Sequence, residues 1–441
     1  MEKKKVLWHS DFNCATGFAT VSQNIVSQLL KTGRYDFDVL AVNHFGEPYD
    51  FTRWPFPIYP AIDFAKGGTD KKYQDPFGRQ RFLDLLSTGK YDIVFTLQDT
   101  FIIEPLASQI SEAKKHLNFK WIFYFPIDGK PQASWINNAL TADFPVTFTH
   151  FGKNETLKVN PAANPRVIYH GVNTKDFHPV GDIAAFRHTF FKEHAAKFIV
   201  TNVNRNQPRK DIPRTLAAFA RFRQLRPDSF LYLHMRPDDV GGNLLDMAAY
   251  WDLEQNNHFM VPMDLDICKG YPIDVLNKIY NASDVVVSTT LGEGWGLTAT
   301  EAMAAKVPLI IPDNTSFSEI GADGRARLVK CGKEFICFGA NDASQYRPLT
   351  DIDDMVAALV DCHDNRGKYK EAAEKAYQWV IGLSWDNIVN QWAEIFELAS
   401  GDISNKLGRN DKCPHCLKNG LDTKWKKCLL HNPEKQHPFY K

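Results

Sequence analysis

The feature that most constrains the fold is an alternation between short apolar runs and helical patterns, which occurs twice along the chain. In the first half, a helical pattern at 19–30 separates the first two of six apolar runs, which span residues 5–9, 37–42, 93–97, 121–125, 146–149 and 166–169. Apolar runs this short, separated by helices, are typical of parallel strands that are buried on both faces of a sheet. The segment 45–75 is rich in Pro, Gly and aromatic residues and is predicted to leave the sheet as a long excursion.

The same alternation starts again near residue 197, after a polar join at 173–195. Strands are expected at 197–202, 230–235, 258–262, 284–288 and 308–311, with a helix at 212–222 and consecutive helices from 351 to about 400. We therefore predict an α/β protein with two doubly wound, Rossmann-like domains that face a cleft. The predicted domains are residues 1–180 and 181–383, followed by a helix at 384–402 and a small tail at 403–441. Ligands of such sheets bind beyond the carboxyl ends of the strands.

Composition excludes several classes of protein. The 441 residues are 44% hydrophobic and 13% aromatic, which is too apolar for a disordered chain. Lys plus Arg and Asp plus Glu both number 52, so the zero net charge excludes a strongly basic coat for nucleic acid or membrane. No apolar run approaches the ~20 residues of a membrane span, and the N-terminus lacks the apolar core of a signal peptide. We expect a soluble, cytoplasmic protein without a membrane span.

The most informative segment is the glycine-rich turn at 288–305, between an expected strand and an expected helix. Its three glycines at 292, 294 and 296 permit close approach of the backbone to a ligand, and the free N–H groups at the helix start favour an anion such as a phosphate. Glu293 in the turn and Glu301 on the helix are separated by seven residues. Carboxylates accept hydrogen bonds from pairs of sugar or ribose hydroxyls. A solvated turn with a surface glutamate is the alternative.

A basic loop follows the first strand of the second half. Arg205 and Lys210 lie five residues apart before a helix. Both reach far enough to bind a diphosphate, the arginine through its planar fork and the lysine as a point charge. The alternative is a solvated run of charges.

Together these residues resemble GT-B-fold retaining glycosyltransferases, in particular glycosyltransferase family four, over roughly residues 3–400. Glu293 to Glu301 resembles the paired-glutamate motif of that family, and Arg205 with Lys210 resembles its diphosphate-binding pair. The segment 170–179 is similar to the end of the family's first domain, and 15–20 matches its first glycine loop, with Gly17 as a donor-binding residue. The helix from residue 384 resembles the segment that crosses back to the first domain.

The resemblance implies a role for each of these residues. Glu301 is expected to hold the ribose of a UDP- or GDP-type nucleotide sugar, and Glu293 to contact the transferred sugar. Arg205 and Lys210 are expected to stabilise the departing diphosphate, so no catalytic metal is needed. Contacts to the sugar and phosphate are expected from the backbone amides of Gly294, Trp295, Gly296 and Leu297. A further contact to the phosphate is expected from the hydroxyl of Thr298.

One departure from the family concerns the first domain. Many members carry a histidine after the strand at 93–97, whereas this chain has Gln98 and Asp99. Asp99 and Asp128 therefore become the candidates for contact with the acceptor hydroxyl or the sugar. A turn or helix-cap aspartate is the alternative for each.

The tail carries a second pattern. Cys413 and Cys416 are separated by two residues, as are Cys428 and His431, and eleven residues separate the two pairs. This is the spacing of a structural zinc site with four ligands, which a tail of about 40 residues needs because its own core is small. The tail resembles the SEC-C zinc module, although that module has one residue, not two, between its first cysteines.

The acceptor is the open point of the function. Residues 402–441 carry nine Lys or Arg against four Asp or Glu, so the tail has a charge of +5 and suits a nucleic-acid or protein partner. This raises a hydroxymethylated DNA base as an acceptor, beside a glycan or a metabolite. The aromatic stretch 49–59 and four basic residues point the same way, namely Lys71, Lys72, Arg79 and Arg81. The alternative to an enzyme is a non-catalytic protein that binds a nucleotide sugar or nucleic acid. A phosphorylase or epimerase fits the glutamate pair less well.

Overall fold

The structure is a computed structural model of the chain and describes residues 2–131, 133–137, 141–265, 270–339 and 344–401. The chain divides into two compact units, residues 1–391 and residues 392–441. Both parallel sheets expected from the sequence are present, and both lie in the first unit. The domain boundaries expected at residues 180, 383 and 402 stay predictions.

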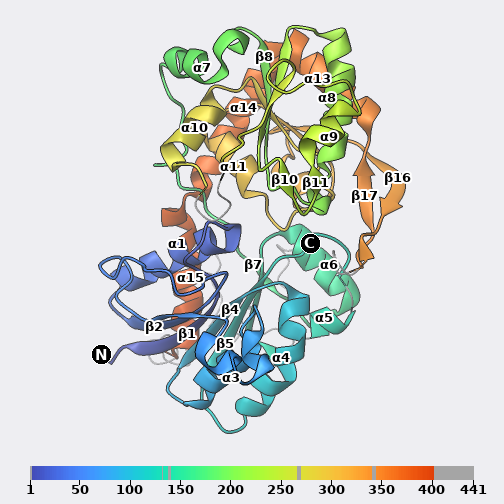
Figure 1. Ribbon diagram of the computed structural model, residues 1–441. Coiled ribbons are helices and arrows are strands. Elements are labelled where there is room, and N and C mark those ends of the chain that lie inside the picture. The colour runs from blue at the N-terminus through green and yellow to red at the C-terminus, as the bar shows by residue number, and fades with distance from the viewer. Residues whose placement is uncertain (1, 132, 138–140, 266–269, 340–343, 402–441) are drawn as a thin grey trace, which may run out of the picture. The chain divides into compact units, whose positions relative to one another are not determined.

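The first sheet has seven strands in the order β3-β2-β1-β4-β5-β6-β7, and every neighbouring pair is parallel. The strands are β1 (Lys4–Asp11), β2 (Tyr35–Val42), β3 (Ile58–Pro60), β4 (Ile93–Leu97), β5 (Lys120–Phe125), β6 (Phe144–Thr147) and β7 (Arg166–Val167). The helices of this half are α1 (Gly17–Lys31), α2 (Phe64–Gly67), α3 (Arg79–Ser87), α4 (Thr100–Ala113), α5 (Ala133–Asn137) and α6 (His150–Val159). Figure 1 shows this half in blue to cyan.

The second sheet has six parallel strands in the order β12-β9-β8-β13-β14-β15. They are β8 (Phe198–Val203), β9 (Ser229–His234), β12 (Phe259–Met260), β13 (Val285–Val287), β14 (Leu309–Pro312) and β15 (Arg327–Val329). The helices are α7 (Ala184–Phe191), α8 (Ile212–Leu225), α9 (Leu244–Ala249), α10 (Ile273–Asn281), α11 (Leu297–Ala304), α12 (Thr315–Ile320), α13 (Ile352–Asp364), α14 (Arg366–Val380) and α15 (Trp385–Ala399). The consecutive helices expected after residue 351 are thus confirmed.

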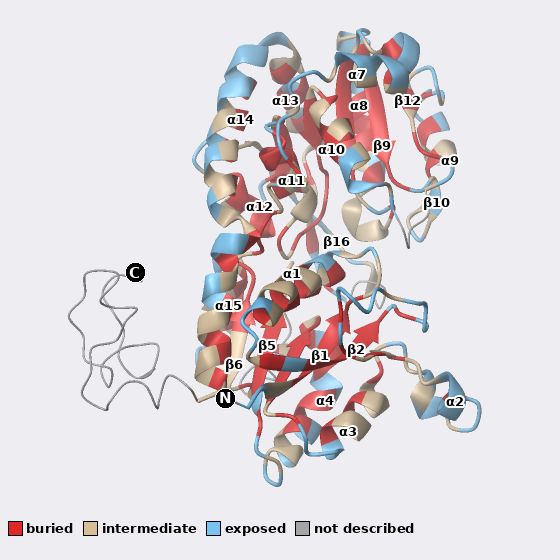
Figure 2. Cartoon of the chain, turned by 90° about the vertical axis from the view of Figure 1, so that its left-hand side faces the viewer, coloured by how far each residue is buried: buried red, intermediate tan, exposed pale blue. Residues whose placement is uncertain are grey.

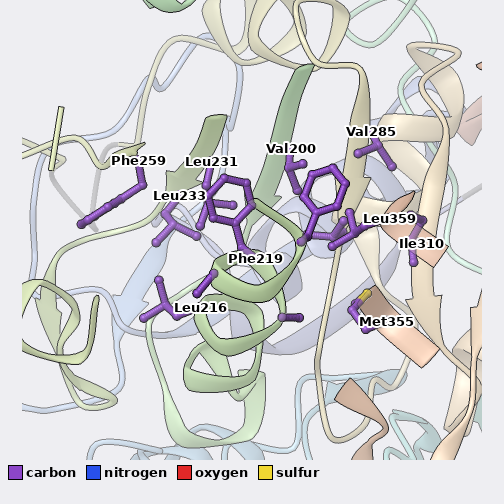
Figure 3. Packing of buried hydrophobic residues seen from close by; sticks show 14 of the residues in the cluster. Val200, Leu216, Phe219, Leu231, Leu233, Phe259, Val285, Ile310, Met355 and Leu359 are labelled. Carbon is purple, nitrogen blue, oxygen red and sulfur yellow. The ribbon is translucent and has the colours of Figure 1, made fainter. Parts of the chain in front are cut away.

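Burial explains why the strands are apolar on both faces. Figure 2 shows the strands of both sheets mostly in the colour of buried residues, whereas helices such as α14 carry exposed or intermediate residues along much of their length. In the second half, α8 buries Ile212, Leu216, Phe219 and Phe222, which recur every three or four residues along its length. These side chains pack with Val200, Leu231 and Val285 of the sheet and with Met355 and Leu359 of α13 (Figure 3).

Three segments differ from the sequence-based expectation. The excursion at 45–75 returns to the sheet as β3, an edge strand that pairs only with β2 and therefore tolerates Pro60. The polar join at 173–195 contains α7. Two short antiparallel hairpins, β10 (Asp238–Asp239) with β11 (Gly242–Asn243) and β16 (Cys331–Ile336) with β17 (Arg347–Thr350), extend from the second half. Their polar strands carry no apolar run, so periodicity does not reveal them.

Strand order fixes where the functional segments gather. The first sheet reverses its winding between β1 and β4, and the second between β8 and β13. Ligands of doubly wound sheets bind at such points, beyond the carboxyl ends of the strands. Four segments with predicted functional residues follow one of these strands, namely 15–20 after β1, 98–99 after β4, 204–211 after β8 and 288–296 after β13. Asp128 follows β5 instead.

Candidate functional site

The glycine-rich turn between β13 and α11 is tightly packed against protein. Gly296 has φ of 103° and precedes α11, and a Cβ atom there would overlap the Phe317 ring. A Cβ atom on Gly294 would lie 2.7 Å from Cβ of Pro126, and one on Gly292 would overlap the carbonyl oxygen of Asp128. The glycines therefore provide room for the 126–128 loop of the first half and for a ring of α12.

Glu293 lies at the centre of a buried cluster of charges. Its carboxylate accepts hydrogen bonds from Nζ of Lys210 and, at 3.2 Å, from Nη1 of Arg209, and its backbone N–H donates to Oγ1 of Thr315 at 2.9 Å. Only 7% of Glu293 is exposed. Burial raises the pKa of its carboxyl group, but the charges of Lys210 and Arg209 outweigh burial and lower it to about 2. Glu293 is therefore ionised across the physiological range.

The other predicted member of the basic pair points elsewhere. Arg205 donates from Nε and Nη2 to the two carboxylate oxygens of Asp239 on β10, at 2.8 and 3.0 Å, and its side chain is half exposed. Arg209, one residue before Lys210, is the arginine that contacts Glu293. Both cations come from the short helical turn Pro208–Lys210, which lies in the loop after β8. This turn places the side chains of Arg209 and Lys210 against the glycine-rich turn. The diphosphate role expected for Arg205 stays a prediction.

Glu301 has a different environment, although it lies on the helix that follows the same turn. Its Oε2 accepts a hydrogen bond of 2.9 Å from the hydroxyl of Tyr280 on α10. No cation within the described residues pairs with it, and burial raises the pKa of its carboxyl group to about 7. The two glutamates therefore differ in charge near neutral pH: Glu293 is fully ionised, and Glu301 is divided between its acid and its carboxylate.

The start of α11 presents the donors expected there. Leu297 and Thr298 occupy the first helical positions, where backbone N–H groups have no partner inside the helix. Thr298 is half-buried, and its hydroxyl has no hydrogen-bond partner in the described part of the chain. Gly17 begins α1 next to this helix, because a Cβ atom on Gly17 would lie 3.2 Å from Cδ1 of Leu297. Trp295 is buried, with its ring 5.0 Å from that of Tyr169.

Asp99 and Asp128 line one small pocket. Oδ1 of Asp128 accepts from Nη2 of Arg347 at 3.2 Å and from Nε2 of Gln345 at 3.4 Å, and its Oδ2 lies 3.5 Å from Nε of Arg209. The carboxylate of Asp99 makes no hydrogen bond within the described residues, and it does not cap α4 with its side chain. Burial and the negative charge of Asp128 raise the pKa of Asp99 to about 7.

Comparison with known proteins identifies the fold. The family model for glycosyl transferases group 1 matches residues 255–343. Anabaena HepE in complex with UDP and glucose matches with a TM-score of 0.65 and 15% identity, over 89% of this chain and 99% of that one. The sucrose-phosphate synthase of Thermosynechococcus elongatus gives 0.67 and 17%, over 90% and 99%. A glycosyltransferase from Rickettsia africae gives 0.66 and 16%, over 90% and 99%. By sequence, no curated protein matches the chain.

The fold is that of the GT-B glycosyltransferases. The expected GT-B architecture of two Rossmann-like domains is confirmed by these structures. In this GT-B chain, the predicted residues Gly17, Lys210, Glu293 and Leu297 are brought together, because they follow strands at the two points where the winding reverses. Arg205 is the predicted residue that lies apart, at Asp239.

Sequence reasoning missed three residues of the candidate site, namely Arg209, Arg347 and Tyr280. Arg209 stands next to Lys210 in the basic loop, but Arg205 is equally basic, so nothing local in the sequence distinguishes the two arginines. Arg347 is only 1% exposed and donates to both the backbone carbonyl and the carboxylate of Asp128. It comes from the β16–β17 hairpin, and nothing local in the sequence links this hairpin to Asp128. Tyr280 lies on α10, and nothing local in the sequence links it to Glu301.

Metal sites were expected only in the tail. Among the described residues, no group of three or more His, Cys, Asp or Glu side chains is arranged to hold a metal ion. The four residues expected to bind zinc, namely Cys413, Cys416, Cys428 and His431, lie outside the described residues, so the zinc site and the SEC-C-like module stay predictions. Within the described ranges, no helix combines the length and the apolar character that a membrane crossing requires.

Proposed function

We propose that the protein is a retaining glycosyltransferase that moves a sugar from a nucleotide-sugar donor to a hydroxyl group of an acceptor. The observation that carries the proposal is the convergence of Glu293, Lys210 and the start of α11 at the winding reversals of two doubly wound sheets. A helix start and two buried cations favour a diphosphate, and a nearby carboxylate favours sugar hydroxyls.

The reaction needs one bond to break and one to form. The bond between C1 of the sugar and the diphosphate oxygen breaks, and the acceptor oxygen forms a bond to C1 from the same face. The acceptor proton passes to the departing phosphate oxygen. Lys210 and Arg209, with Arg205 as a third candidate, would stabilise the charge that develops on the diphosphate. Because these cations supply positive charge at the diphosphate, the mechanism we propose uses no catalytic metal ion.

The donor is a nucleotide sugar of the UDP or GDP type, and one observation supports uridine. Anabaena HepE was solved with UDP and with UDP-glucose, and it shares the fold of this chain. In our proposal, Glu301 accepts hydrogen bonds from the ribose hydroxyls, and the hydroxyl of Tyr280 positions its carboxylate. The amides at 294–297 and the hydroxyl of Thr298 complete the donor site.

The test is a thermal-shift panel of UDP-, GDP- and ADP-sugars on the wild type and on Glu301→Ala. A ligand that binds only the folded protein raises the melting temperature. We expect a shift with UDP-sugars that is lost in Glu301→Ala. Exposed Glu334→Ala, on β16, is the matched control and should keep the shift. A shift of equal size in Glu301→Ala would contradict the assigned role, and no shift with any donor would contradict the proposed function.

A second candidate is a non-catalytic protein that binds a nucleotide sugar or nucleic acid. Gln98 and Asp99 favour this second candidate, because many members of the family that the sequence resembles carry a histidine at this place. Slow hydrolysis of the bound donor, followed by release of the nucleoside diphosphate, separates the two candidates. Release would favour the enzyme, and tight binding without any release would favour the binding protein. A cytoplasmic location and contacts of the zinc-type tail to nucleic acid or protein remain predictions.

A further inference from the structure

The pocket that contains Asp99 and Asp128 has lining side chains of two kinds. Carboxylates come from the loops after β4 and β5, and aromatic rings come from Phe101 of α4 and Trp135 of α5. Gln345, next to β17, closes one side, and a Cβ atom on Gly129 would overlap its amide oxygen. No lysine, arginine or histidine is among the residues that line this pocket.

The size of the pocket limits what enters it. Its volume is about 20 Å³, which suffices for one water-sized group. A single hydroxyl or hydroxymethyl group fits this space. The ring that carries this group, whether a sugar or a nucleobase, is larger than the pocket and would stay outside it. The pocket therefore suits the attacking hydroxyl of an acceptor whose remaining atoms stay outside it.

The two aromatic rings provide a surface beside the pocket for the rest of the acceptor. The ring centroids of Phe101 and Trp135 lie 5.6 Å apart, 37% of Phe101 is exposed, and Trp135 is half-buried. Aromatic faces pack against apolar C–H groups, while carboxylates accept hydrogen bonds from hydroxyls. A sugar ring presents both kinds of group, C–H bonds on its faces and hydroxyls at its edge.

The charges around the pocket decide between neutral and anionic acceptors. Arg209 and Arg347 already bind Asp128, and Arg209 also binds Glu293. Asp99 forms no ion pair of its own among the described residues. Burial and the charges of Asp128 and Asp11 raise the pKa of its carboxyl group, whereas the charges of Arg209 and Arg347 lower it, and the net shift is upward. A phosphate placed here would add negative charge beside a carboxylate that lacks a counter-ion. A neutral hydroxyl avoids this cost, and an ammonium group on the acceptor would reduce it.

Three of the four basic residues that suggested DNA from the sequence are held by the chain itself. Arg79 binds Asp75 at 2.7 Å, and Arg81 donates to the carbonyl oxygen of Pro60 at 2.7 Å. Lys72 lies 3.2 Å from Asp70. These groups therefore offer a phosphate backbone less positive charge than their number suggests.

We infer that the acceptor is an uncharged or amine-bearing sugar whose hydroxyl enters between Asp99 and Asp128 while its ring packs on Phe101 and Trp135. The inference rests on the proposed function, because it concerns the acceptor of that reaction. It selects a carbohydrate over the hydroxymethylated DNA base that the sequence left open.

The first experiment compares acceptors with the full-length wild-type protein and the donor selected by the thermal-shift panel. Methyl α-glucoside, methyl α-mannoside and methyl glucosaminide are compared with glucose 6-phosphate and with a duplex that contains hydroxymethylcytosine. We expect kcat/KM for the neutral and amino sugars to exceed that for the phosphorylated sugar by about tenfold or more, which corresponds to ~1.4 kcal/mol. Preference for the phosphorylated sugar or the duplex would overturn the inference, as would hydrolysis of the donor without transfer to any of the sugars.

The second experiment tests the aromatic surface with Trp135→Leu and Phe101→Leu. Each should raise the acceptor KM by about two- to tenfold, because an aromatic contact with the acceptor ring is lost. The donor Kd, measured by calorimetry without acceptor, should stay at the wild-type value. Tyr250→Leu removes an aromatic side chain that is 81% exposed and lies outside the pocket, so it should change neither quantity.

These readouts distinguish a failure of the acceptor assignment from a failure of the proposed function. Failure to bind any donor would overturn the proposed function itself. Donor binding and hydrolysis at wild-type rates, with an unchanged acceptor KM in both aromatic variants, would overturn only the acceptor assignment. Far-UV circular dichroism and the melting temperature check that the variants fold, and the acceptor comparison on the wild type does not depend on them.

Discussion

Replacement of Glu293 by glutamine gives the sharpest test of the buried charge cluster. The substitution keeps the size of the side chain and removes its negative charge, so Lys210 and Arg209 lose the carboxylate to which they donate. A buried charge without a partner is strongly destabilising, typically by ~3–5 kcal/mol. We therefore expect Glu293→Gln to lower the free energy of unfolding at neutral pH.

The pKa of Glu293 gives an independent magnitude. Its carboxyl group titrates at about 2 in the folded protein and at 4.5 in an unfolded reference. At ~1.4 kcal/mol for each pKa unit, the ionised carboxylate contributes roughly 3 kcal/mol at pH 7. Because the folded pKa is the lower one, this contribution is complete above about pH 4.5 and is lost as the pH falls toward 2. At pH 3, about half of it remains.

The assay is urea unfolding of the wild type and Glu293→Gln, followed by tryptophan fluorescence between pH 7 and pH 3. Urea is uncharged and so does not screen the ion pairs. The difference in unfolding free energy should be roughly 3 kcal/mol at pH 7 and should shrink to about half of that at pH 3. Glu374→Gln is the control, because Glu374 pairs with Lys306 at the surface, where ion pairs contribute little.

Two results would refute the reasoning. A difference smaller than ~1 kcal/mol at pH 7 would mean that the two cations do not depend on Glu293 for compensation. A difference that stays constant from pH 7 to pH 3 would mean that the loss comes from packing and not from charge.

Three further predictions follow from single residues. The affinity for the UDP-sugar, measured by calorimetry, should rise from pH 6 to pH 8, because Glu301 has a pKa of about 7 and ionises over this range. Glu301→Gln should show no such rise, and an equal pH dependence in both proteins would refute the ribose role of Glu301. Gly296→Ala should lower the melting temperature, because φ is 103° and a Cβ atom would overlap the Phe317 ring; an unchanged melting temperature would show that the turn adapts. Leu216→Ala should cost ~2–5 kcal/mol in urea unfolding, since Leu216 is fully buried beneath the second sheet, and a cost below ~1 kcal/mol would contradict its place in that core.

Much of the fold follows from local pattern. Apolar runs between helices predicted both parallel sheets, and most of the expected strands lie within a few residues of the observed ones. The shortest and most polar strands escaped, because a strand of two or three residues shows no period. The edge strand β3 is held by pairing with β2, and β16 and β17 are held by pairing with each other. The sequence of a single strand does not contain this information.

Some residues of the candidate site were likewise predictable from local sequence, and others were not. The turn at 288–296 was predictable, because glycine spacing after a strand is a local signal. The arginine that faces Glu293 was not, because Arg205 and Arg209 are equally basic and lie in one loop. Asp239, on a hairpin 34 residues farther along, binds Arg205, and the turn 208–210 directs Arg209 to Glu293.

The sequence by itself determined the two parallel sheets, the strand-turn-helix unit with its glutamates, and the positions of the functional loops at the carboxyl ends of strands. These depend on periodicity, glycine placement and the position of a loop directly after a strand, which are features of short stretches of chain. The tertiary structure decided the charge states and partners within the site. Asp99 lies beside Asp128, Glu293 is compensated by two cations, and Glu301 meets only a tyrosine hydroxyl. Burial and Coulomb interactions act through space, so they depend on which distant residues the fold brings within a few ångströms.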